Sequence, residues 1–439
     1  MATLDIIRPT AEMPLMPIEM ARLVGRLDRG DSMSAIFVDI MSNGMVSCIE
    51  DEKWFGEHAD AMWELLHTMS RPFLRCVLTK TLGPDLYDKH IFSQKNWENV
   101  LDIDGPGAYV MFSFIRDRKG RWLCGSEIKT LVSMMTDYRA AVDVCIRRRE
   151  QDAYGGSQLT GEEKRVLGKA MKIDDAERTN KHHLTLDDLD RFNPRFESRS
   201  TGSGFITQLI AMLERRCLQH LDQGVWQYQS PLMVGNAGNM KKRIVDHVPN
   251  NSLSKTPKVW GLLLSCMCVM GLPYEVQAAP LFRAWVDARQ LNVAEVLGTV
   301  LAGSLISVAG LNVKQPGTRD EDARTDTYGY LNGKKHVFAA KTWFKENLEL
   351  SLRESDRIRK IQGELDVRNA ELEELEEEEG GLVNEEKALQ KKLQDAMEKL
   401  HRATATLERE AMVDKALLAA TDEKAQAAEK FLAAYDNRV

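Results

Sequence analysis

The segment 233–247 constrains the fold of this chain more than any other, because its character changes within a short span. It begins with the apolar run 233–235, ending in glycine, passes through turn-forming residues and then becomes a basic amphipathic stretch. This order predicts a buried strand, a turn and a helix. Asn239, Arg243 and His247 follow at steps of four residues and would share one helix face. A glycine before such a polar helix favours a phosphate-binding site.

Length and composition set the broad class. The 439 residues allow two or three domains, and 43% hydrophobic content with 28% charge is ordinary for a protein with a packed core. The formal net charge of −7 argues against a protein that simply coats nucleic acid, since such proteins are usually basic. We therefore expect a globular protein with local sites.

Cysteines and apolar runs indicate the compartment. The seven cysteines are odd in number and form no Cys-x-x-Cys pair, which favours a reduced environment. The start of the chain lacks the apolar core of a signal peptide. Glycines and serines interrupt the longest apolar stretches, 260–272 and 296–311, so we expect no membrane span. These features predict an intracellular protein, nuclear or cytoplasmic.

The pattern of apolar residues predicts an α/β (α+β) chain in four parts. These are an N-terminal α/β segment at 1–100, an α/β unit at 101–222, a second at 223–340 and a helical part at 343–439. Strands are expected at 35–41, 107–112, 122–125, 225–228, 233–235 and 311–313. Helices are expected at about 56–68, 126–151, 161–171, 205–221, 257–270, 278–289 and 293–308.

The last hundred or so residues differ in composition from the rest. Glycine and proline nearly vanish, and Ile358, Ile361, Leu365, Leu372 and Leu375 keep a heptad register. A second register runs through 389–407, after the glycine pair 380–381. This spacing predicts a coiled coil, either a helical hairpin or one long helix with a hinge. We expect it to mediate self-association or to bind a partner helix.

The unit at about 223–318 contains the triplets Gly224-Val225-Trp226 and Met233-Val234-Gly235 on its two expected strands. With these triplets where Gly-Ile-Tyr and Tyr-Ile-Gly would stand, the unit resembles a GIY-YIG nuclease domain. The residues that correspond to the family's later motif positions are Asn239, Arg243, His247, Glu295 and Asn312.

The resemblance implies hydrolysis of phosphodiester bonds in nucleic acid, with DNA as the first expectation. It implies Mg²⁺ or Mn²⁺ held by Glu295, transition-state stabilisation by Arg243, and help from His247 in activating water. Asn239, Lys241, Lys242, Arg243 and Asn312 would contact the nucleic acid.

Two departures affect the implied chemistry. Trp226 and Met233 replace both motif tyrosines, and neither side chain can act as a base. Tyr228 lies on the same strand face as Trp226 and is a candidate substitute, displaced by about 7 Å along the strand. Loss of a positioned acid or base typically costs about 10²- to 10⁴-fold in rate.

A fainter copy of the motif is present at about 105–222. Gly107-Ala108-Tyr109 resembles Gly-Ile-Tyr, and Leu123-Cys124-Gly125 stands where Tyr-Ile-Gly would across a hairpin. Tyr109 is thus a second candidate catalytic tyrosine. The alternative is an ordinary hairpin followed by helices.

The site residues also have structural interpretations. Arg243 would pair with Asp246 or Asp287, and His247 would be a cation at a helix C-terminus. Glu295 would lie in the first turn of a helix capped by Asn292. Asn312 would be a turn residue.

The sequence leaves three functions open: a metal-dependent endonuclease, a degenerate nuclease fold that binds nucleic acid, and an interaction protein that acts through its coiled coil. Cleavage lost in Glu295→Ala would indicate the first. Salt-sensitive binding without cleavage would indicate the second.

Overall fold

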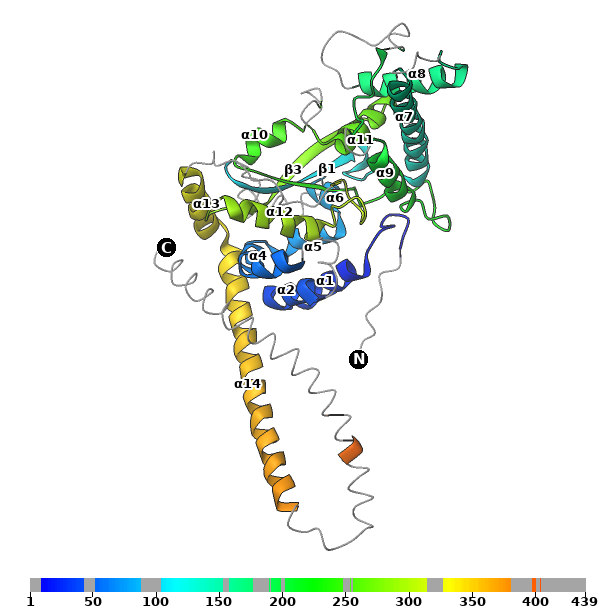
Figure 1. Ribbon diagram of the computed structural model, residues 1–439. Coiled ribbons are helices and arrows are strands. Elements are labelled where there is room, and N and C mark those ends of the chain that lie inside the picture. The colour runs from blue at the N-terminus through cyan, green and yellow to red at the C-terminus, as the bar shows by residue number, and fades with distance from the viewer. Residues whose placement is uncertain are drawn as a thin grey trace.

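The computed structural model combines many helices with one small antiparallel sheet (Figure 1). The α+β class is therefore confirmed in this coarse form. The structure describes residues 9–42, 52–87, 104–152, 158–176, 189, 191–198, 202–247, 253, 256–313, 327–379, 397–399 and 403. No helix among these residues is both long enough and apolar enough to cross a bilayer.

The helices are α1 Ile18–Arg29, α2 Met33–Ser42, α3 Glu52–Glu57, α4 Ala59–His67, α5 Arg71–Thr79, α6 Leu82–Tyr87, α7 Gly125–Asp152, α8 Gly161–Asp175, α9 Gly204–Glu214, α10 Met240–Val245, α11 Lys258–Val269, α12 Ala288–Ala302, α13 Thr327–Ala340 and α14 Thr342–Glu379. The strands are β1 Gly107–Ile115, β2 Met233–Ala237 and β3 Tyr274–Arg283. A 3₁₀ turn, η3 Arg116–Arg118, follows β1.

The sheet has the order β2-β1-β3, and β1 pairs antiparallel with both neighbours. All nine residues of β1 are buried, which suits its apolar sequence and its central position. The predicted strands at 107–112 and 233–235 are confirmed. The sheet draws strands from both 101–222 and 223–340, so these two ranges do not form separate sheets.

Helices cover both faces of the sheet. Alternate residues of β1, beginning with Ala108 and Val110, join a core made with α1, α2, α4, α5, α12 and the start of α14. Tyr109 and Met111 face a second core, made with α7, α8, α9, α10 and α11. This alternation follows from the pleat of the strand. Figure 1 shows α10 on one side of the sheet and α12 on the other.

Several predicted elements are wrong. The expected strand at 35–41 is helix α2, because its buried residues, including Met33, Ile36 and Ile40, recur at helical spacing. The expected helix at 278–289 begins as strand β3. Pro280 lies in β3 at a register irregularity opposite Tyr109, a position where a strand tolerates a missing N–H.

The expected strands at 122–125 and 225–228 are reduced to one isolated bridge, between Cys124 and Trp226. The chain turns after η3 and enters α7 at Gly125, so no hairpin forms with β1. The expected strand at 311–313 is likewise a single bridge, between Leu305 and Asn312. The helices predicted at 126–151, 161–171 and 257–270 are confirmed as α7, α8 and α11. The helix predicted at 293–308 is present as α12 but begins and ends earlier, at Ala288 and Ala302, and α9 ends earlier than expected, at Glu214.

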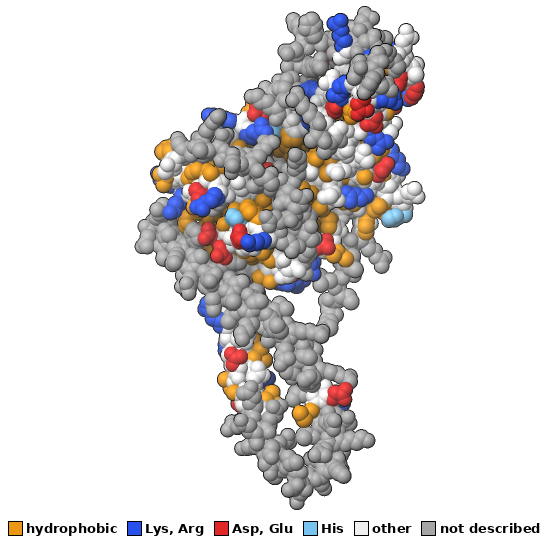
Figure 2. Space-filling model, viewed as in Figure 1, with side chains coloured by type: hydrophobic (Ala, Val, Ile, Leu, Met, Phe, Trp, Pro, Cys, Tyr) orange, Lys and Arg blue, Asp and Glu red, His pale blue; other side chains and the backbone are white. Residues whose placement is uncertain are grey.

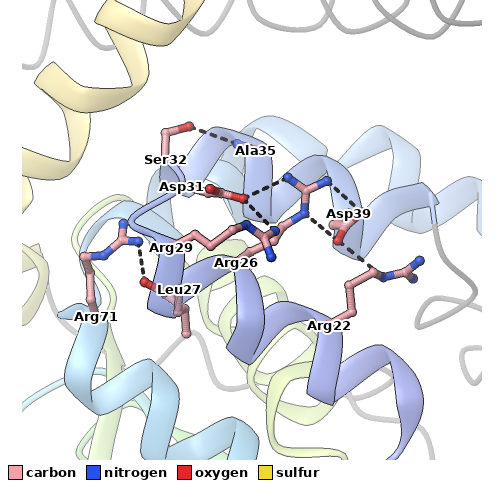
Figure 3. Close-up of polar contacts among 9 residues, drawn as sticks. All are labelled: Arg22, Arg26, Leu27, Arg29, Asp31, Ser32, Ala35, Asp39 and Arg71. Carbon is pink, nitrogen blue, oxygen red and sulfur yellow. Dashed lines mark hydrogen bonds and ion pairs between the residues drawn. The ribbon is translucent and has the colours of Figure 1, made fainter. Parts of the chain in front are cut away.

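Arginine–aspartate contacts join the N-terminal helices (Figure 3). Arg26 on α1 donates to Asp39 on α2 over 2.7 Å and to Asp31 in the connecting turn over 3.1 Å. Arg71 at the start of α5 donates to the carbonyl of Leu27 over 3.2 Å, at the C-terminal end of α1. These bonds fix the layer that packs beneath the sheet.

The long helix α14 begins in the first core and then projects from the globular body (Figure 1). Its residues Ile361, Val367 and Leu372 are exposed. The coiled coil expected at 343–439 stays a prediction. The glycine pair 380–381 and nearly all of the second heptad register lie outside the described residues.

Candidate phosphodiester site beside the central strand

The candidate site begins at the pairing of β1 with β2. The two strands run antiparallel, and residues 109–111 pair with residues 235–233, so that Tyr109 is the partner of Gly235. A Cβ at Gly235 would lie 2.8 Å from the Tyr109 hydroxyl oxygen, so only glycine leaves room for the phenol ring. The strand that pairs with 233–235 is therefore β1, through residues 109–111, and not the segment Gly224-Val225-Trp226.

Tyr109 contacts His247 on the face of the sheet that α10 covers. The hydroxyl oxygen lies 2.9 Å from Nε2 of His247, and the ring centroids are 5.9 Å apart. The two residues are only 2% and 1% exposed. Tyr109, from the fainter motif copy, thus contacts His247, from the stronger copy.

His247 lies beyond the C-terminal end of α10. Its N–H donates to the carbonyl of Ile244, and its own carbonyl accepts a bond of 3.2 Å from Nε1 of Trp260 on α11. Because it is buried in this turn, His247 is not a solvated cation at a helix end.

Burial, with a smaller contribution from the neighbouring Arg243 guanidinium, lowers the pKa of His247 to about 4, and Asp246 opposes the shift. The imidazole is therefore neutral at pH 7. A neutral imidazole has one acceptor nitrogen and one donor nitrogen. Within the described part of the chain, Nδ1 of His247 has no hydrogen-bond partner.

Helix α10 presents a short basic surface. Lys241 and Lys242 are exposed, and Arg243 is half-buried with a 3.4 Å contact to Asp246. Figure 2 shows Lys and Arg side chains at the surface in the region of α10. The predicted pairing of Arg243 with Asp246 is thus present, and it leaves much of the guanidinium accessible.

Asn239 is the N-cap of α10 and is not part of a helical stripe. Its Oδ1 accepts from the Lys242 N–H over 3.0 Å, and its Nδ2 donates to Asp104 over 3.0 Å. The expectation that Asn239, Arg243 and His247 share one helix face is wrong, because α10 spans only Met240–Val245. The three residues occupy the cap, the helix and the turn after it.

Tyr228 is engaged elsewhere. Its hydroxyl accepts a bond of 2.7 Å from Arg121, whose guanidinium also stacks on the ring at 4.4 Å. Its N–H donates to the carbonyl of Glu12. The candidate base on the strand side is therefore Tyr109, whereas Tyr228 belongs to the junction with the N-terminal segment.

Asn312 binds the outer edge of β2. Its Oδ1 accepts from the Val234 N–H over 2.9 Å, and its Nδ2 donates to the Val234 carbonyl over 2.7 Å. The side-chain amide thus imitates a neighbouring strand. This contact shows a positioning role for Asn312, and direct contact with nucleic acid stays a prediction.

Glu295 lies within α12, on the other side of the sheet from α10. The N-cap of α12 is Asp287, not Asn292, so Glu295 is in the third turn and its expected dipole role at the N-terminus is wrong. Asn292, three residues earlier, lies 3.3 Å from Nδ2 of Asn236 on β2, which places this side of α12 beside β2. Among the described residues no group of three or more His, Cys, Asp or Glu side chains is arranged to hold a metal ion.

Sequence reasoning missed the long-range pairing that assembles the site. The strands 107–109 and 233–235 are separated by α7, α8 and α9, whereas short hairpins were expected at each place. The sequence did hold one signal for this pairing. Gly107 and Tyr109 match the glycine and the tyrosine of Gly-Ile-Tyr, whereas 224–226 has no tyrosine. No family model, curated protein or solved structure matches the chain significantly.

Proposed function

We propose that this protein is a GIY-YIG-like endonuclease that binds nucleic acid through α10 and hydrolyses its phosphodiester bonds. The observation that supports this most is the antiparallel pairing of β1, which contains Gly107-Ala108-Tyr109, with β2, which contains Met233-Val234-Gly235, so that Tyr109 lies opposite Gly235. This pairing supplies one motif tyrosine, Tyr109, and places it in contact with His247. The helices α7–α9 are then a long insertion between the two motif strands of a single unit.

The Tyr109–His247 pair can orient the attacking water. The neutral Nε2 of His247 can accept a hydrogen bond from the Tyr109 hydroxyl, which leaves the phenol oxygen directed to accept a hydrogen bond from water. His247 is held by the turn after α10, so this geometry is preorganised. In this proposal Tyr109 is the catalytic residue that positions water, and His247 positions Tyr109.

The basic residues of α10 would bind the substrate. Arg243 precedes His247 by one helical turn and would hold the phosphate, since a guanidinium offers several donors in a fixed plane. Lys241 and Lys242 are exposed and would contact neighbouring phosphates. Duplex or single-stranded DNA is the expected substrate.

A divalent ion is part of the proposal and would supply Lewis-acid activation of the phosphate when bound. Glu295 lies with α12 on the other side of the sheet from α10, so it would not hold this ion beside a phosphate bound by α10. Mg²⁺ usually keeps several waters, so water and the substrate phosphate would supply most of its ligands.

A second function, nucleic-acid binding without cleavage, is favoured by the burial of Tyr109 and His247 and by the presence of Met233. The residues Tyr109 and His247 are almost fully buried, and a methionine occupies the second tyrosine position. These features favour a fold that binds nucleic acid through α10 without cleaving it. The basic surface would then keep its role while Tyr109 and His247 support the core.

A cleavage assay with matched variants separates the two functions. Single-stranded, duplex and branched DNA and RNA would be incubated with Mg²⁺, Mn²⁺ or EDTA. We expect metal-dependent products that Tyr109→Phe and Arg243→Ala each reduce by at least about 10²-fold. The control Arg353→Ala, which changes an exposed residue of α14, should leave them unchanged.

The outcomes have distinct meanings. Absence of products, together with salt-sensitive binding that Lys242→Ala and Arg243→Ala weaken, would establish the binding function instead. Absence of both products and binding would contradict both functions.

Self-association through α14 completes the proposal. Ile361 and Leu372, which belong to the heptad register and share one helix face, are exposed on the projecting part of this helix and favour a partner helix. A dimer would present two nucleic-acid sites and raise avidity. Sedimentation of the whole chain beside an Ile361→Lys/Leu372→Lys variant tests this, and a monomer in both cases would contradict it.

A further inference from the structure

Helix α13 is fixed at the end of the sheet where α10 begins. Its Gly333 packs against the residue that follows β3, since a Cβ there would lie 2.2 Å from the carbonyl oxygen of Ala284. Ala284 in turn donates its N–H to the carbonyl of Pro106 over 3.0 Å. The neighbouring carbonyl of Gly105 accepts from the N–H of Met240, the first residue of α10, over 2.9 Å. Figure 1 shows both helices at this end of the sheet.

The outer face of α13 carries an aromatic and an aliphatic side chain beside a lysine. Tyr328 is 68% exposed and Leu331 is 53% exposed, and Lys335 is exposed one turn later. Their spacing of three and four residues places all three on one helix face. The opposite face, which includes the buried Tyr330, packs on the globular body. The ring of Tyr328 is therefore open to solvent on a helix that is already anchored by its other side.

The two helices are locally basic. Neither α10 nor α13 contains an aspartate or a glutamate. Their five lysine and arginine side chains are Lys241, Lys242, Arg243, Lys334 and Lys335. In a chain whose formal net charge is −7, these helices form a positive surface that attracts a polyanion.

We propose that this end of the molecule binds single-stranded nucleic acid, with phosphates along α10 and at Lys335 and one base stacked on the ring of Tyr328. This inference rests on the nucleic-acid binding proposed above, with or without cleavage, and specifies the form of the substrate. In a single strand each base offers a flat face to an aromatic side chain, and such stacking tolerates any sequence. In a duplex the bases stack on one another, so Tyr328 would find no free face.

The surroundings of Tyr328 favour nucleic acid over a protein partner. The centre of a protein interface is depleted in lysine, whereas Lys335 shares the face of Tyr328 and Leu331. A single exposed ring next to cations is the combination by which proteins hold single strands without reading their sequence. Charge and ring together thus select a polyanion that has accessible bases.

Fluorescence anisotropy with the whole chain tests the proposal, in EDTA so that no strand is cleaved. The probes are labelled strands of about 12 nucleotides, which suits the usual site size for single strands, made of DNA or RNA, and a DNA duplex of the same length. We expect Tyr328→Ala to weaken single-strand binding by about tenfold, because stacking of one base contributes at least this order of affinity. Duplex binding should be unchanged. Tyr328→Phe keeps the ring and should bind every probe as the natural chain does.

The lysine is tested by salt dependence. Lys335→Ala should lower the slope of log affinity against log salt for the single strand by about the value of one phosphate contact. The control Lys360→Ala changes a lysine of α14 that is 79% exposed, and it should alter neither the affinity nor the slope. The strand, DNA or RNA, that binds more tightly identifies the preferred nucleic acid.

Two kinds of negative result are distinguishable. Single-strand binding that Tyr328→Ala leaves unchanged, or duplex binding that it weakens equally, would overturn this proposal while the binding function of α10 stands. Failure of the natural chain to bind any of the probes would contradict the proposed nucleic-acid function and this inference with it. Because Tyr328 is exposed, Tyr328→Ala should melt at the same temperature as the natural chain, which separates lost stacking from lost folding.

Discussion

The hydroxyl of Tyr109 lies 2.9 Å from Nε2 of His247, although 138 positions separate the two residues in the chain. The bond joins the central strand of the sheet to the turn after α10, in a region where both residues are almost fully buried. It therefore contributes to stability whether or not the protein cleaves nucleic acid.

Replacing Tyr109 by phenylalanine should destabilise the fold. The ring would keep its place against Gly235, but Nε2 of His247 would lose its partner inside the core. An unsatisfied buried polar group typically costs about 1–3 kcal/mol. Denaturant unfolding of Tyr109→Phe measures this loss, with Tyr328→Phe, 68% exposed on α13, as the control. Equal unfolding midpoints in the two variants would contradict the prediction.

Gly235→Ala should also destabilise the fold, by a different cause. The added methyl group would lie 2.8 Å from the Tyr109 oxygen and 2.9 Å from Cζ, closer than carbon atoms approach without a shift. Overpacking of this kind costs about 1–3 kcal/mol. Gly161→Ala, where nothing lies within 4 Å, is the matched control.

A smaller side chain at position 109 should relieve this strain. Gly235→Ala should therefore cost less in a Tyr109→Leu background than in the natural chain, and a double-mutant cycle measures the difference. Strictly additive losses would show that the two residues do not compete for space.

The His247 imidazole should make stability fall in mild acid. Its folded pKa is about 4, below the usual 6.5, so the unfolded chain binds a proton between these values that the folded chain does not. This contribution to stability is complete above about pH 6.5 and is lost as the pH falls toward 4.

Urea unfolding at pH 7.5 and pH 5 measures the effect. His247→Gln should lose less stability between the two pH values than the natural chain does, because glutamine does not titrate. The control His220→Gln changes an exposed residue and should show the same pH dependence of stability as the natural chain. An unchanged pH dependence in His247→Gln would show that the histidine is not buried as a neutral ring.

Local patterns predicted much of this fold. The helices α7, α8, α11 and α12 and the strands β1 and β2 follow from apolar spacing, because each buries a continuous face. Helix α2 and strand β3 were assigned to the wrong class because α2 is buried on most sides and β3 has a continuously buried second half, 279–283. In such runs periodicity no longer separates strand from helix. Pro280, which interrupts a helix but fits a strand at a bulge, was the overlooked signal.

The site could be predicted only in part, because its geometry depends on pairing over a long range. The sequence predicted Arg243 and His247 as site residues. It could not identify the strand that pairs with 233–235, because residue spacing does not distinguish a local hairpin from pairing with a strand far away in the chain. The buried cations Lys80, Arg216, Arg283 and Lys341 were not anticipated. Nothing in the residues around them indicates burial, which arises from tertiary packing alone.

Lys80 offers the clearest test of such a buried cation. It is fully buried at the C-terminal end of α5, and within the described part of the chain its Nζ has no hydrogen-bond partner. Burial lowers its pKa to about 7, with a further contribution from the nearby Arg216, which is itself buried. The folded chain therefore prefers a neutral Lys80, whereas the unfolded chain keeps the proton up to about pH 10.4.

Stability should consequently rise with pH from about 7 toward 10, because in this window the unfolded state binds the proton that the folded state has released. Unfolding free energies at pH 6.5 and pH 9 measure the rise. Lys80→Met should be more stable than the natural chain at pH 6.5 and should gain less between the two pH values. It should still gain something, since Lys341 titrates in the same range. Lys172→Met, an exposed control on α8, should show the full rise, and a Lys80→Met variant that shows it as well would mean that Lys80 reaches solvent or a counter-ion in the folded state.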